Sequence, residues 1–194
     1  MPTHAALERY HPLLMYSLLA AVRRFEPDFY AHLCRAHHLD ADRILGLFSE
    51  VEELGPAQLT AVLGELREHQ AYHDIVHLAG RNALHGLSEQ QRLRASLLAL
   101  GSAARFASLV KQALPPFLGI SSFVHLVRGD LQFVEVRDSV FARGVHSERP
   151  LCGFYAGLLA ELGSQCVTGA ANSAEIRCCG MDPEAQSCLF QVSL

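Results

Sequence analysis

Apolar residues recur with helical spacing along the first two-thirds of the chain. They do so from Leu13 to His37, on both sides of Glu26-Pro27-Asp28, where the proline interrupts a helix because it has no backbone N–H. Asp40 can cap a short helix that runs to Leu47, and Gly55-Pro56 puts a proline at the first position of the next one. The pattern predicts a series of helices.

A further long helix is predicted in the middle of the chain. Ser88-Glu89-Gln90-Gln91 has the spacing of a capping box, which is typical of a helix start. We expect this helix to end before Pro115-Pro116, because a proline cannot continue it without losing a hydrogen bond.

After Gly119 the apolar residues alternate with polar ones, as they do in β-strands. Phe123–Val127 and Leu131–Val136 flank Arg128-Gly129-Asp130, which predicts a β-hairpin with Gly-Asp at its tip. Helical spacing then returns from Ser147 to Leu162, where Gly163 is suited to end the helix.

Three short strands complete the pattern, near Gln165–Gly169, Ala174–Cys179 and Cys188–Leu194. In the last of them Cys188, Phe190, Val192 and Leu194 point to one side and the residues between them to the other. Helices followed by a small antiparallel sheet with a packed helix predict an α+β fold.

Composition narrows the class of protein. A length of 194 residues suits one domain, with room for a helical appendage, and the formal charge of −4 without a clustered basic face argues against nucleic-acid binding. The first apolar run, Leu13–Val22, is shorter than the ~20 residues of a membrane span, and no signal peptide is recognisable. We therefore expect a cytoplasmic protein, in which six cysteines indicate metal binding or buried thiols before disulfides.

Four residues in the last third of the chain offer donors for a metal: Cys152, Glu175, Cys178 and Cys188. Three thiolates and a carboxylate fill the four positions of a tetrahedral zinc ion and leave none for water, which indicates a structural metal. The alternative is that these cysteines are small buried hydrophobic residues, as free cysteines often are.

Strand geometry does not decide whether Cys178 or Cys179 is the third cysteine ligand. Glu175 and Cys178 fall on opposite faces of a regular strand, whereas Glu175 and Cys179 share a face. Either a bulge or strand end lies at Arg177, or Cys179 replaces Cys178 as the ligand. The adjacent thiols also allow a redox site, although nothing in the sequence indicates a lowered thiol pKa.

Several stretches resemble the vinyl-4-reductase domain family: Val136–Gly144, Pro150–Gly157, Glu175–Cys178 and Cys188–Phe190. The resemblance is good in the last third of the chain and weak before it. It implies the small-molecule-binding fold of nitric-oxide-signalling and Golgi-transport (TRAPP-like) proteins, with 86–194 as the family domain and 1–85 as a helical region able to serve in dimerisation. Relatives that respond to phenols and xylenes bind zinc, which implies as ligands here Cys152, Glu175, Cys178 and Cys188.

Two other groups of residues are candidates for binding. His69, His73 and His77 have ligand spacing on one helical stripe, which allows an adventitious or interfacial metal site, but they are more simply solvated or partly buried side chains. Either the stripe runs from the core into solvent, or the helix breaks between Leu66 and Ile75. An apolar pocket or an ordinary core would use the same aromatic residues, and sequence does not separate the two. The candidate pocket residues are Phe106, Phe123, His125, Phe133 and Phe154.

We therefore expect a small-molecule sensor or binding module that takes an apolar or aromatic ligand, carries structural zinc, and forms a homodimer as relatives commonly do. A separate protein partner would carry its output, because the sequence contains no DNA-binding segment or ATPase domain. The resemblance also admits a tetrapyrrole-binding protein or a vinyl-reductase accessory in bacteriochlorophyll-type biosynthesis, and an interaction scaffold is a third possibility. No catalytic or cofactor motif is visible, which argues against an enzyme.

Overall fold

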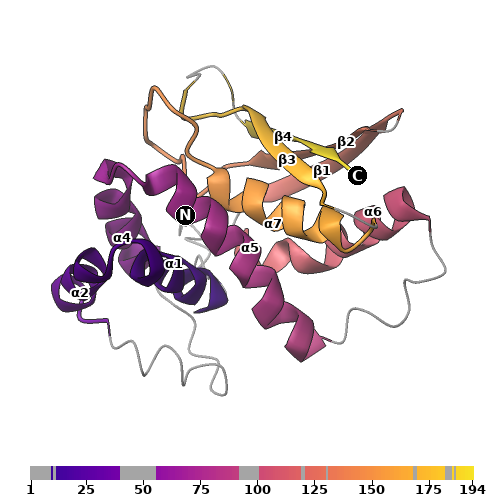
Figure 1. The fold of residues 1–194 in the computed structure, drawn as a ribbon. Coiled ribbons are helices and arrows are strands. Elements are labelled where there is room, and N and C mark those ends of the chain that lie inside the picture. The colour runs from indigo at the N-terminus through magenta and orange to yellow at the C-terminus, as the bar shows by residue number, and fades with distance from the viewer. Residues whose placement is uncertain are drawn as a thin grey trace, which may run out of the picture.

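The computed structural model describes residues 10, 12–39, 56–91, 101–118, 121–129, 131–167, 170–181, 185 and 187–194. Within them, helices precede an open four-stranded antiparallel sheet against which one helix packs (Figure 1). This arrangement confirms the α+β prediction. The short helix expected from Asp40 to Leu47 lies outside the described residues. No described helix is both long enough and apolar enough to cross a membrane.

Prolines set the boundaries of the first helices, as predicted. Helices α1 (Pro12–Phe25) and α2 (Pro27–Ala36) meet at Glu26, and α4 (Pro56–Glu68) begins at its proline. The chain then turns at residues 69–71 before α5 (Tyr72–Gln91), which confirms a break between Leu66 and Ile75.

The helix predicted to run from Ser88 to Pro115 differs from the structure at its start and agrees with it at its end. Ser88 does not start a helix but lies inside α5, because serine, glutamate and glutamine are all tolerated in a helix interior. The prediction that a helix ends before Pro115-Pro116 is confirmed, since α6 (Ser102–Ala113) is followed by a 3₁₀ turn (Pro115–Phe117). The expected boundary between regions 1–85 and 86–194 falls within α5, and this division stays a prediction.

The sheet contains the predicted hairpin, β1 (Ser122–Arg128) and β2 (Leu131–Arg137), with Gly129 at its turn in the left-handed region, at φ 60°. β4 (Ser187–Ser193) pairs with β2, and β3 (Asn172–Arg177) pairs with β4, so the order is β1-β2-β4-β3. The two edges are therefore β1 and β3.

Two predicted elements in this half are wrong in detail. The helix expected from Ser147 begins only with α7 (Gly153–Ser164), because Pro150 disfavours helical geometry in the residue before it. The strand expected at Gln165–Gly169 is not formed at residues 165–167, where Gln165 and Cys166 donate backbone hydrogen bonds back to the end of α7.

Helix α7 is the centre of the core. It lies between the sheet and α5, and α1 packs against α5 in turn (Figure 1). Nearly every residue of α7 is buried, which is typical of a helix that is apolar on all sides. Glycines permit the contact between α5 and α7: a Cβ built on Gly80 would lie 1.9 Å from the Phe154 carbonyl oxygen, and one built on Gly157 would lie 2.0 Å from the His77 carbonyl oxygen.

Candidate metal centre

The structure brings together four side chains that the sequence singled out. The ligand atoms of Cys152, Glu175, Cys178 and Cys188 all lie within 4.8 Å of one another. The cysteines are buried and Glu175 is half-buried. These residues come from three places, namely the N-terminus of α7, the end of β3 and the start of β4. The cluster therefore lies where the central helix meets the sheet.

An irregularity in β3 explains how Cys178, rather than Cys179, lies on the same side as Glu175. The register with β4 shifts between Glu175, which pairs with Phe190, and Arg177, which pairs with the next residue, Leu189. Two residues of β3 therefore face one residue of β4, as in a β-bulge. Because Phe190 is buried and belongs to the inner face, Glu175 points inward, while Arg177 is carried to the outer face.

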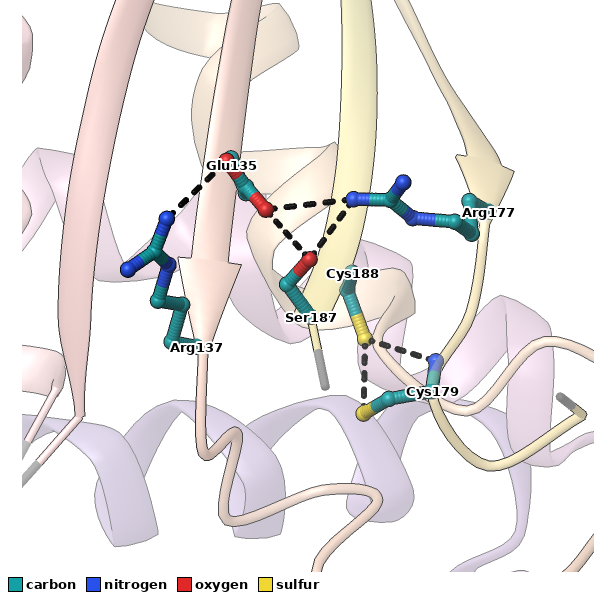
Figure 2. Close-up of polar contacts among 6 residues, drawn as sticks. All are labelled: Glu135, Arg137, Arg177, Cys179, Ser187 and Cys188. Carbon is teal, nitrogen blue, oxygen red and sulfur yellow. Dashed lines mark hydrogen bonds and ion pairs between the residues drawn. The ribbon is translucent and has the colours of Figure 1, made fainter. Parts of the chain in front are cut away.

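Side-chain contacts fix Arg177 on that outer face (Figure 2). Its guanidinium lies 3.1 Å from a Glu135 carboxylate oxygen and donates to Ser187 Oγ at 2.7 Å. These contacts tie the end of β3 to β2 across the start of β4. Because Arg177 points outward, the following Cys178 lies on the same side as Glu175. Of the two alternatives that the sequence left open, the structure has the bulge at Arg177.

Backbone N–H groups point at the candidate ligands. Cys152 N donates to Glu175 Oε2 at 3.0 Å, and Leu151 N donates to Cys178 Sγ at 3.4 Å. Cys179 N contacts Cys188 Sγ at 3.5 Å, and its own Sγ lies 3.3 Å from the same sulfur (Figure 2). Donors of this kind orient ligands and stabilise thiolate charge around protein-bound metals. Cys179 thus lies beside the four-residue cluster, with its backbone N–H on one of the four donors.

Charge in the cluster is unevenly distributed. Burial raises the pKa of the Glu175 carboxyl to about 9 and also raises the pKa of the Cys152 thiol. Hydrogen bonds from Cys152 and Cys188 lower the pKa of Cys178, and the same two thiols lower the pKa of the neighbouring Cys179. Glu175 Oε1 is buried and has no hydrogen-bond partner among the described residues. A cation would satisfy that oxygen and favour the charged forms of the other donors.

The sulfur positions suit a small ion with modest adjustment. Cys152 Sγ and Cys188 Sγ lie 2.9 Å apart, farther than the roughly 2.05 Å of a disulfide bond. A tetrahedral zinc ion with bonds of about 2.3 Å to sulfur sets its sulfurs about 3.8 Å apart. The pair would have to separate by roughly 1 Å to take up such an ion.

Two residues that the sequence did not single out support the cluster. Ser139 Oγ lies 3.0 Å from Cys152 Sγ, and the Tyr72 hydroxyl donates to the Leu151 carbonyl oxygen at 2.7 Å. Tyr72 is the first residue of α5, so this bond joins that helix to the segment that carries Cys152. The only sequence signal for Ser139 was its place in Val136–Gly144, and Tyr72 had none.

The three spaced histidines do not form one stripe. His69 precedes α5 and stacks on Phe29, with 4.8 Å between ring centroids. His73 is exposed and His77 half-buried on α5, and burial lowers the pKa of His77. No group of described residues suited to hold a metal includes any of the three.

The five candidate pocket residues lie in three places. Phe106 and His125 are in edge-to-face contact at 5.7 Å, on α6 and the inner face of β1, where Phe123 also lies. Phe154 is fully buried and stacks on Phe141 at 5.2 Å. Phe133 pairs with Leu126 on the outer face of the sheet. The structure therefore brings Phe106 and His125 together, but leaves Phe133 on the opposite side.

No protein-family model matches the chain, and no curated protein sequence matches it either. Solved structures do match. The crystal structure of an H-NOX protein from S. oneidensis in the Fe(II) ligation state has a TM-score of 0.59 at 15% identity, and the match covers 95% of each chain. A structure described as modulating heme redox potential through protein-induced porphyrin distortion has a TM-score of 0.55 at 14% identity, over 95% of this chain and 99% of that one.

The phenol-responsive sensory domain of the transcription activator PoxR, with phenol, matches at a TM-score of 0.44 and 16% identity, over 72% of this chain and 74% of that one. The match to the H-NOX structure shows that the chain has the fold of H-NOX proteins, which agrees with the predicted α+β class. The vinyl-4-reductase resemblance is not confirmed, since no family model matches.

Proposed function

We propose that this protein is a small-molecule-binding module whose central helix is clipped to its sheet by a structural zinc ion. The observation that carries the proposal is the convergence of Cys152, Glu175, Cys178 and Cys188 within 4.8 Å. Zinc would connect the N-terminus of α7 to both β3 and β4. With four protein ligands the ion is closed to water, so it would stabilise the fold rather than catalyse a reaction.

The donor set fits zinc for three reasons. Thiolate and carboxylate donors in tetrahedral number are those that zinc takes in structural sites. The buried Oε1 of Glu175 has no hydrogen-bond partner in the described part of the chain, which is costly unless a cation or proton satisfies it. Backbone N–H groups already point at Glu175, Cys178 and Cys188, as is usual around bound metals.

The two adjacent cysteines give the most specific prediction about the site. We expect Cys178→Ser to lower the bound zinc from about one ion per chain to near none, because it removes a ligand. Cys179→Ser should keep about one ion, because the backbone N–H that contacts Cys188 remains. Elemental analysis of both variants after dialysis checks this. Equal zinc loss in the two variants, or loss in Cys179→Ser alone, would contradict the assignment of Cys178.

For the ligand we propose a site at the contact between Phe106 of α6 and His125 on the inner face of the hairpin. Phe106 supplies an apolar ring there, and His125 Nε2 lies 3.0 Å from the Oε1 of buried Gln132. Burial lowers the pKa of His125, so the ring is neutral near pH 7 and offers one polar atom in apolar surroundings. This combination suits a small apolar or aromatic molecule with one polar group.

A thermal-shift panel tests this ligand class. Aromatic and aliphatic compounds that bind the native protein should raise its melting temperature, and one present at about 100 times its Kd stabilises by roughly 2.7 kcal/mol. We expect His125→Leu to reduce the shift for compounds with a polar group and to leave shifts for purely apolar compounds nearly unchanged. A flat response across the panel would favour the interaction scaffold, whereas identical shifts in the variant would place the ligand away from His125.

The tetrapyrrole alternative draws support from the fold neighbour that is described by its heme. The described residues fit such a group poorly. The face of α7 that carries Gly153 and Gly157 packs against α5, so it is not open to a flat ligand. The absorption spectrum of the protein after addition of hemin separates the tetrapyrrole from the smaller ligand. A Soret band of ligated heme would favour the tetrapyrrole, and its absence would favour the smaller ligand.

A further inference from the structure

The edge strand β1 is unusually apolar on its exposed surface. Val124, Leu126 and Val127 are 38, 46 and 55% exposed, and they are half of the large hydrophobic residues found exposed in the described part of the chain. The other three are spread over α1, β3 and the turn after it, at Phe25, Ile176 and Met181. Exposed apolar surface on this fold is therefore concentrated on one strand.

This strand also has an open hydrogen-bonding edge. β1 pairs only with β2, so the backbone groups on its other side have no strand partner among the described residues. Natural proteins usually protect such an edge with a lysine, a proline, a bulge or a very short strand. β1 has seven residues in regular register, its sequence, SFVHLVR, contains neither lysine nor proline, and its one charged residue, Arg128, is the last of the strand. An apolar strand of this kind is suited to pair with another strand.

We propose that β1 pairs antiparallel with β1 of a second copy of this chain, joining two four-stranded sheets into one. The reason to assign a second copy is that the strand is complementary to itself. When the two-fold axis passes at His125, Val124 faces Leu126 of the partner subunit, and Leu126 faces Val124 of the partner subunit. Phe123 and Val127 pair in the same way on the inner face. Each large apolar side chain of the strand thus meets another, as in stable cross-strand pairs.

The pairing is isologous, so it closes at two copies and leaves no further edge of the same kind. It puts the exposed parts of Val124 and Leu126 into contact and fills the hydrogen bonds of both edges. The other edge, β3, lies at the far side of each sheet beside the metal centre. This inference rests on the strand alone and holds whether or not zinc or a small molecule binds.

A charge-pair experiment tests both the interface and its register. Val124→Lys or Leu126→Glu alone would put a charge against an apolar residue of the partner, so each should weaken the dimer at least about 100-fold. The double variant should restore most of the affinity, because each introduced lysine then faces an introduced glutamate across the interface. Phe25→Lys, at an exposed apolar residue of α1, is the matched control and should leave the dimer intact.

Sedimentation equilibrium over a wide concentration range measures these constants, and circular dichroism checks that every variant is folded. The proposal expects a native dimer, monomers for the two single variants and a dimer for the double variant. A native protein that stays monomeric at 100 times the usual working concentration, or a dimer that neither single variant weakens, would overturn the interface. A double variant that stays monomeric would overturn the antiparallel register centred on His125.

Discussion

Replacing Cys152 by serine should cost the protein both its metal and a large part of its stability. We expect bound zinc to fall to near none, and the free energy of unfolding to fall by roughly 4 kcal/mol, which is what a ligand at about 1,000 times its Kd contributes. Cys152 is the member of the cluster at the N-terminus of α7, so without it the ion no longer connects that helix to the sheet. Metal analysis and urea unfolding of the variant measure the two effects.

A matched cysteine separates metal loss from the loss of a buried thiol. Cys166 is also buried, but its Sγ donates to the Leu162 carbonyl oxygen, a bond that a serine hydroxyl can make. We expect Cys166→Ser to keep about one zinc ion per chain and to cost less than about 1 kcal/mol. Removing the metal from the native protein with a chelator should lower its stability to near that of Cys152→Ser. If the chelator removes the metal and leaves the unfolding curve unchanged, the metal does not stabilise the fold.

The second large effect is expected at the contact between α5 and α7. Gly157→Ala should destabilise the protein by about 3 kcal/mol, because overpacking of a dense core is costly. A Cβ at this position would lie 2.0 Å from the His77 carbonyl oxygen and 3.2 Å from the Arg81 backbone nitrogen. Both neighbours are backbone atoms of a regular helix, so no side-chain rotation relieves the clash, and the helices must separate by roughly 1 Å. Urea unfolding of the variant gives the change.

Gly64→Ala is the control for this prediction. Gly64 lies in the interior of α4, and a Cβ built there meets nothing within 4 Å. Alanine favours the helix over glycine by about 0.5 to 1 kcal/mol, so this variant should be slightly more stable than the native protein. The two substitutions are chemically identical and should have opposite signs. A destabilisation of Gly157→Ala no larger than that of an ordinary surface change would contradict the close helix contact.

The parts of the fold that local chemistry determines could be predicted. Pro27 and Pro56 set helix boundaries, and the alternation on both sides of Gly129 indicated the hairpin. The errors arose where a local signal had a competing interpretation. The residues from Ser88 have the spacing of a capping box but are equally compatible with a helix interior. The apolar residues keep helical spacing on both sides of Pro150, but the helix itself begins only after this proline.

The four-residue cluster could be predicted in its members but not in its geometry. Donor types indicated Cys152, Glu175, Cys178 and Cys188, while strand parity left Cys178 and Cys179 open. The bulge depends on Arg177, which reaches Glu135 on a strand that is distant in sequence, and no local pattern contains that contact. The contact of Gly157 with α5 could not be predicted from the sequence either, because a glycine on a helix accepts a neighbouring helix or a flat ligand alike.

X-ray absorption at the zinc edge of the purified native protein measures the proposed zinc site itself. We expect about one zinc per chain with three sulfur neighbours at about 2.3 Å and one oxygen neighbour at about 2.0 Å, which corresponds to the three cysteines and Glu175. A shell of four sulfurs would replace Glu175 by Cys179. A protein that holds no zinc after preparation in zinc-containing buffer would contradict the proposal that a zinc ion connects α7 to the sheet.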